Sequence, residues 1–129
     1  MSSLFTKIIA GEIPCYKIAE DNNFIAILDV NPNAKGHTLC IPKLEINKIF
    51  DMDEELYLGL MKFSRKIAIA LEKTVACKRI GVAVIGLEVP HVHVHLIPLQ
   101  DMDAMRFQKK VTLTKAEFEE LLTAIQSNL

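Results

Sequence analysis

Three of the four histidines in the chain alternate with apolar residues in one short stretch, His91-Val92-His93-Val94-His95-Leu96-Ile97-Pro98. Successive side chains of a β-strand point to opposite faces of a sheet. A strand here therefore places the three histidines on one face and Val92, Val94 and Leu96 on the other. The apolar face is ordinary core, whereas imidazoles facing a protein interior need polar partners. The histidine face predicts a functional site.

Two kinds of chemistry fit such a face. Neutral imidazole is a common zinc ligand, and a His-x-His pair on one strand supplies two ligands. Imidazole also acts directly, when one ring attacks a substrate while its neighbours hold its tautomer and bind developing negative charge. A third interpretation makes the three rings satisfied structural groups. The spacing alone does not separate metal binding from nucleophilic catalysis.

The composition is that of a globular protein: the 129 residues are 50% hydrophobic and 24% charged, which predicts a single domain over residues 1–129. The 15 basic and 16 acidic residues give a net charge of −1, which argues against binding to nucleic acid. The N-terminus does not resemble a secretory signal, and no apolar run reaches the roughly 20 residues of a membrane span. We therefore expect a cytoplasmic protein without a membrane partner, whose cysteines (Cys15, Cys40 and Cys77) are reduced and mostly buried.

The periodicities predict an α+β fold with an antiparallel sheet. The expected strands are Tyr16–Ala19, Phe24–Asp29, Thr38–Ile41, Ile80–Ile85 and the histidine strand, which ends near Leu99. The expected helices are a short one at residues 3–10, a long one at 53–76 after a capping box of Asp51 with Glu54, and a C-terminal one after a capping box at Thr114–Glu117. The segment Gln100–Lys110 has no clear pattern, but it follows the histidine strand directly.

The histidine stretch resembles the signature of the histidine triad (HIT) family. Gly36–Lys43 is similar to that family's second motif and carries the fourth histidine, His37. The opening Phe5–Pro14, then Glu20-Asp21, then Ile27–Pro32, is similar to the start of the nucleoside phosphoramidase branch of the family. The resemblance spans residues 5 to about 99. It implies a HIT-like fold, with a five-stranded antiparallel sheet, one long helix and short terminal helices, and a homodimer with a continuous sheet.

The resemblance also implies a function, namely a nucleotide hydrolase or transferase that attacks the α-phosphate of a purine nucleotide such as an adenosine phosphoramidate. His93 would form a covalent nucleotide intermediate, His95 would bind the α-phosphate or bridging oxygen, and His91 with His37 would orient them. Asp29 would accept hydrogen bonds from the ribose hydroxyls. Neither a metal nor another cofactor would be needed. The apolar positions that would line the base pocket are Phe5, Ile8, Ile27 and Val30.

The sequence departs from the family pattern in three places, one of which is the end of the strand before the triad loop, where the usual Asn is missing. The loop before the triad is cut to residues 86–90 and lacks the usual Gln and Ser or Thr that contact the phosphate and leaving group. The Cys-x-x-Cys of some relatives, which can bind structural zinc, is absent at Ser2–Thr6. Because loop 86–90 lacks those side chains, the group that protonates the leaving group is unassigned. Two alternatives to a phosphoramidase stay open, a dinucleoside polyphosphate hydrolase and a nucleotide-binding module with little catalysis.

Overall fold

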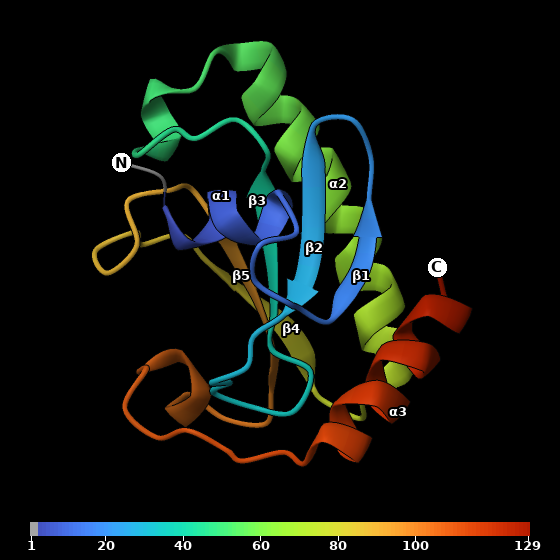
Figure 1. The fold of residues 1–129 in the computed structure, drawn as a ribbon. Helices are drawn as coiled ribbons and strands as arrows, with labels where there is room; N and C mark the ends of the chain where they lie inside the picture. The colour runs from blue at the N-terminus through green and yellow to red at the C-terminus, as the bar shows by residue number, and fades with distance from the viewer. Residues whose placement is uncertain (1–2) are drawn as a thin grey trace.

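The computed structural model describes residues 3–129, and its five strands form an antiparallel sheet in the order β1-β2-β3-β5-β4 (Figure 1). The strands are β1 (Lys17–Glu20), β2 (Phe24–Leu28), β3 (Thr38–Pro42), β4 (Arg79–Ala83) and β5 (Val94–Leu99). The helices are α1 (Leu4–Ile9), α2 (Glu54–Thr74) and α3 (Lys115–Ser127), with short 3-10 turns at Ile49–Asp51 (η1) and Asp103–Met105 (η2). The predicted α+β class with one long helix is confirmed.

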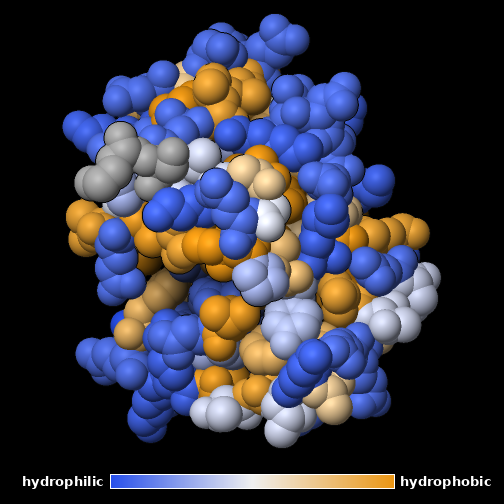
Figure 2. Space-filling model, in the orientation of Figure 1, coloured by the Kyte–Doolittle hydropathy of each residue, from blue (hydrophilic) through white to orange (hydrophobic). Residues whose placement is uncertain are grey.

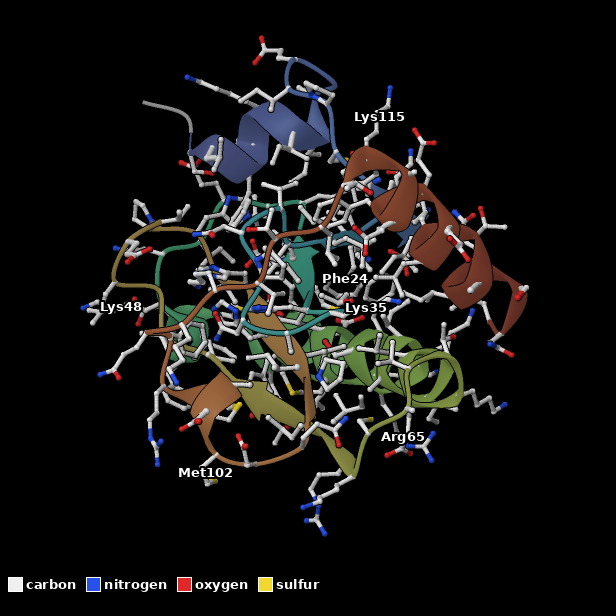
Figure 3. The ribbon with its side chains drawn as sticks, turned by 90° about the horizontal axis from the view of Figure 1, so that it is seen from below. Phe24, Lys35, Lys48, Arg65, Met102 and Lys115 are labelled. Carbon is white, nitrogen blue, oxygen red and sulfur yellow. The ribbon has the colours of Figure 1, made fainter. Side chains whose placement is uncertain are left out.

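Alternate side chains of β2 enter two separate cores, as the period of a strand requires. Phe24 and Leu28 pack in a large cluster with α2 and α3, whereas Ile25 and Ile27 pack with Phe5 of α1. Helices α1 and α2 consequently cover opposite faces of the sheet, which is clear in the view from below (Figure 3). On β5 and just before it, Val92, Val94 and Leu96 belong to the α2 core, as the alternation predicted.

The histidine strand begins three residues later than predicted. The ladder to β3 starts at the pair Cys40 and Val94, and the ladder to β4 ends at the pair Ala83 and His95. Upstream, the Val92 amide donates instead to the carbonyl of Ile46, outside β3 and β4. The stretch 91–93 is thus held by loop contacts, while its side chains still alternate between the two faces.

The start of α2 also differs from the prediction. The expected capping box of Asp51 with Glu54 is wrong, because Asp51 lies in η1 and Asp53 is the N-cap, its carboxylate accepting from the Leu56 amide at 2.8 Å. The capping box of α3 at Thr114 and Glu117 is confirmed.

Two smaller predictions can be compared directly with the structure. Of the three cysteines, which are all free, Cys40 is buried, but Cys15 and Cys77 are only half-buried. Across residues 3–129, no helix is both long enough and apolar enough to cross a membrane.

Candidate active site

The site lies on the sheet face that carries α1, and His37 reaches it through a tight turn. Gly36 precedes His37 with φ of +94°, and a Cβ there would approach Val75 Cγ2 to 2.9 Å, so this turn requires glycine. His37 then sits directly before β3 and is 1% exposed. Its Nε2 lies 2.9 Å from Nδ1 of His95 on the neighbouring strand β5.

The partners of His37 set the direction of this imidazole pair. The backbone N–H of Asn33 donates to His37 Nδ1 at 2.9 Å, so the ring proton of neutral His37 is on Nε2. That proton is donated to His95 Nδ1, which leaves the proton of His95 on Nε2. A single backbone amide thereby makes His95 a hydrogen-bond donor at its outer nitrogen.

His93 has the opposite tautomer. Its Nδ1 lies 2.7 Å from the carbonyl oxygen of His91, an acceptor only, so the proton is on Nδ1 and the Nε2 lone pair is free. The ring of Phe5 packs against His93 edge to face, with centroids 4.8 Å apart. The backbone carbonyl of His91 thus fixes the tautomer of His93.

His91 is fully buried behind His93 and is tied to two segments distant in sequence. Its Nε2 donates to the carbonyl of Pro42 at 2.7 Å, and its Nδ1 lies 2.7 Å from Ser3 Oγ. Ser3 is also the N-cap of α1, and its backbone amide donates to Glu45 at 2.6 Å. Helix α1 is therefore docked onto the triad through one hydroxyl, a contact that the sequence analysis missed although Ser3 before Leu4–Ile9 fits an N-cap position.

Burial keeps His37, His93 and His95 neutral. Desolvation lowers the pKa of His37 from the ordinary 6.5 to about 3 and that of His95 to about 4, with the neighbouring histidines adding to the effect. Desolvation also lowers the pKa of His93, whereas the hydrogen bond that its ring donates to the His91 carbonyl acts to raise it. All three rings are thus uncharged at neutral pH, which suits the tautomers described above.

A cleft of about 390 Å³ opens onto His93 and His95. Figure 2 shows a hollow on this face, between α1 and the lower part of the molecule. One part of the cleft lining is apolar and comes from α1, β3 and the loop between β4 and β5: Leu4, Phe5, Leu39, Ile85, Leu87 and Val89. The polar part of the lining, besides the two histidines, comprises Asp29, Asn31, Glu88 and Lys110.

The residues predicted for the base pocket have different positions relative to this cleft. Phe5 lines it. Ile27 is buried in the same apolar cluster as Phe5, and Ile8 is half-buried and packs against that cluster, but neither forms part of the lining. Val30 is 66% exposed and also lies outside the lining. Its place in a base pocket stays a prediction, whereas Leu39 and Val89 are lining residues that the sequence analysis did not assign to that pocket.

Asp29 lines the cleft directly after β2. One carboxylate oxygen accepts from the Asn31 amide at 2.9 Å, and the other lies 3.6 Å from His37 Nε2. Burial raises the pKa of Asp29, while that hydrogen bond opposes the rise. The second oxygen has no closer donor among the described residues, so it is available to a ligand hydroxyl.

Asp29, His37 and His95 bring one ligand atom each within 4.8 Å of one another, and this geometry bears on the metal alternative. A metal needs a lone pair on His37 Nε2. The Asn33 N–H already occupies the Nδ1 lone pair, which forces the proton onto Nε2. These residues do not fit a metal ion in the arrangement described.

The segment after β5 forms one wall of the cleft, a role that the sequence did not predict beyond proximity. Phe107, with φ of +58°, packs its ring edge to face on His95 at 4.8 Å between centroids. Lys110 lines the cleft beside it. Both residues lie in a polar stretch without a helical or strand period, so no local pattern could have found them.

Comparison with known proteins adds the family. The HIT domain family model matches residues 10–102. An adenosine 5'-monophosphoramidase of Saccharomyces cerevisiae is 37% identical over 99 residues, covering 76% of this chain and 63% of that protein. The structure of a Hit-like protein from Bartonella henselae superposes with a TM-score of 0.86 at 31% identity, over 99% of this chain and 96% of that one. A zinc-bound histidine triad protein from Mycobacterium smegmatis superposes with a TM-score of 0.81 at 28% identity, over 99% and 93% of the two chains. With its buried triad, His37 and this match over most of its length, the chain belongs to the HIT domain family.

Proposed function

We propose that this protein is a purine-nucleotide hydrolase or transferase that attacks the α-phosphate through a covalent intermediate on His93, with an adenosine phosphoramidate as its type of substrate. Family membership and the phosphoramidase relative support nucleotide hydrolysis as the general activity. The observation that carries the proposal is the His93 tautomer. Its Nδ1 proton is committed to the His91 carbonyl, so its Nε2 lone pair faces the cleft as a nucleophile.

The reaction requires the lone pair of His93 Nε2 to form a bond to phosphorus while the bond to the leaving group breaks with its electron pair. Negative charge then spreads over the phosphoryl oxygens. The Nε2–H of His95 donates a hydrogen bond to that charge from a fixed position, since His37 and Asn33 lock its tautomer. Water attacks the histidine–nucleotide bond in a second step, releases the nucleoside monophosphate and restores His93.

The cleft supports a purine nucleoside as the part of the substrate that is retained. Phe5, Leu39 and Val89 give an apolar slot for a base, and Ile8 and Ile27 belong to the apolar cluster around Phe5. The open carboxylate oxygen of Asp29 suits a ribose hydroxyl.

The test is hydrolysis of a fluorogenic adenosine 5'-phosphoramidate by the wild type and by His93→Ala, each with and without a chelator. We expect turnover in the wild type that survives the chelator and is lost in His93→Ala, and a nucleotide adduct on His93 after acid quenching. Turnover by His93→Ala at the wild-type rate would overturn the covalent mechanism. Loss of activity with the chelator would favour a metal enzyme instead.

The same assay separates the remaining alternatives. Preferred turnover of a diadenosine polyphosphate over the phosphoramidate would indicate a dinucleoside polyphosphate hydrolase. Binding of AMP without turnover of either substrate would indicate a nucleotide-binding module.

Three further proposals concern the whole protein. Residues 1–129 form a single HIT domain, and the protein is cytoplasmic. It is also a homodimer, a proposal that rests on the exposed edge of β4.

A further inference from the structure

Lys110 is a charged residue of the cleft to which the proposed chemistry gives no role. It supplies the only ammonium group among the described lining residues, whose other charged side chains are the carboxyl groups of Asp29 and Glu88. It comes from the segment between β5 and α3, outside the matched part of the family model, which ends at residue 102. The loop that usually supplies phosphate contacts is short here, so a replacement from another segment is of interest.

Several contacts hold Lys110 at the cleft. Its Nζ donates to Asn33 Oδ1 at 2.5 Å, and it lies 5.3 Å from the centroid of the Phe107 ring. The next residue, Val111, donates its amide to the carbonyl of Pro32 at 2.9 Å. Asn33 in turn donates its side-chain amide to the carbonyl of Ala104 at 2.6 Å. The ammonium group is thus fixed by both the loop before His37 and its own segment.

The positive charge of Lys110 is not paired with a negative charge within the described part of the chain. Its ammonium group forms no ion pair with a carboxylate there, and Asn33 takes only one of its three N–H donors. The positive charge of Lys110 nevertheless acts on the site electrostatically, since it lowers the pKa of Asp29, His37 and His95. A cation with two free donors beside neutral imidazoles is suited to an anionic ligand.

We propose that Lys110 binds the phosphate of the nucleotide, placing its ammonium group on the non-bridging oxygens that His95 also faces. This inference rests on the proposed function and adds a binding residue to it. The substrate brings negative charge to a cleft whose histidines are all neutral and whose other charged groups are acidic. Lys110 is the group that offsets this charge, and it contributes more as negative charge develops on the oxygens during phosphoryl transfer.

The test compares Lys110→Met with Lys109→Met, using calorimetric titration with AMP and with adenosine. Methionine keeps an unbranched side chain beside Phe107 and removes the charge. Lys109 is an exposed neighbour outside the cleft lining, so its variant removes the same charge from the same segment. We expect Lys110→Met to bind AMP about tenfold more weakly, from the loss of a charged hydrogen bond, and to bind adenosine with unchanged affinity. Lys109→Met should bind both ligands as the wild type does.

Each other outcome contradicts the inference. Equal weakening of AMP and adenosine would make Lys110 a structural tie between Asn33 and its segment. Unchanged AMP affinity in Lys110→Met, with a wild type that still hydrolyses the phosphoramidate, would remove Lys110 from phosphate binding and leave the proposed function standing. A wild type that neither binds AMP nor hydrolyses a nucleotide would overturn both.

Discussion

His93 and His95 are the same residue type two positions apart, and their hydrogen-bond partners give them opposite roles. His93 presents a lone pair to the cleft because its proton is donated to a carbonyl oxygen. His95 presents a proton because its inner nitrogen accepts from His37. The difference is set by two backbone groups, the carbonyl of His91 and the amide of Asn33. Neither group can be exchanged by a side-chain substitution.

The lowered pKa of His93 leads to a prediction about the pH dependence of catalysis. Only the neutral ring has a nucleophilic lone pair, and burial holds its pKa below the ordinary 6.5. We expect kcat/KM for the fluorogenic phosphoramidate to stay level from about pH 8 to below pH 6.5, and then to fall about tenfold per pH unit. An acid limb that begins at or above pH 6.5 would contradict this environment for His93.

The buried state of His37 makes a prediction about stability. Its pKa is about 3 in the folded chain and near 6.5 when unfolded, so the unfolded chain binds the proton first as pH falls. The free energy of unfolding should therefore decrease below pH 6.5, by up to about 1.4 kcal/mol per pH unit from this residue. Urea unfolding at about pH 6.5 and pH 5 measures the slope of the free energy of unfolding against pH. In His37→Gln this slope should correspond to about one proton fewer taken up on unfolding.

Glu45 provides the matched control for that slope. Hydrogen bonds from the Thr6 hydroxyl and the Ser3 amide lower its pKa to about 2 from 4.5, so its contribution is lost only as pH falls below that higher value. Glu45→Gln should leave the slope between pH 6.5 and pH 5 unchanged. A slope that disappears in Glu45→Gln but persists in His37→Gln would contradict the assignment to His37.

Among the elements, α1 is joined to the triad by its N-cap. Ser3→Ala removes both the cap and the partner of His91 Nδ1. We expect a loss of about 1 kcal/mol in unfolding free energy and about a tenfold fall in kcat with little change in KM, because the ring behind His93 loses its anchor. Asp53→Ala removes the N-cap of α2, which lies outside the cleft lining. It should cost similar stability and leave kcat unchanged, and a fall in kcat for both variants would make the effect of Ser3 one of stability alone.

The elements themselves were predictable because their signals are local. Each expected helix and strand is present, with ends displaced by a few residues. The error at β5 arose because the alternation of side chains continues through His91–His93, where the backbone is bonded to loops. The histidines and Asp29 were found by their motifs. Lys110 was not, since its partner Asn33 is 77 positions away and no periodic pattern connects them.

At the scale of the whole molecule, the cleft is assembled from segments that are far apart in sequence. Helix α1, the loop between β4 and β5 and the segment after β5 each supply lining residues. Strand β5 supplies His95, and the backbone just before β3 and β5 supplies His37, His91 and His93. This division would let the triad stay in place while loop 86–90 and the segment after β5 vary in the side chains that they bring to the cleft.

The open edge of β4 leads to a prediction about assembly. β4 is the last strand of the sheet. Val82 on this strand is 58% exposed, and Ile85 just beyond it is 50% exposed. The neighbouring groove contains Ala68 and Ile69 of α2 with Ile80 of β4, together with the charged residues Arg65, Glu72, Lys78 and Arg79. An edge with unpaired backbone groups beside apolar side chains favours pairing with a second copy, which would extend the sheet across two chains. We therefore expect light scattering on a sizing column to give the mass of a dimer.

Val82→Lys should shift that mass toward the monomer, because two lysines would face each other across paired edges. Leu44→Lys is the control, since Leu44 is 63% exposed and follows β3, which is separated from β4 by β5. It should leave the mass unchanged. A wild-type monomer at micromolar concentration, or a dimer that tolerates Val82→Lys, would rule out pairing through β4. Ile85 lines the cleft and also lies beside this edge, so the phosphoramidase assay on Val82→Lys also tells whether each copy is active alone.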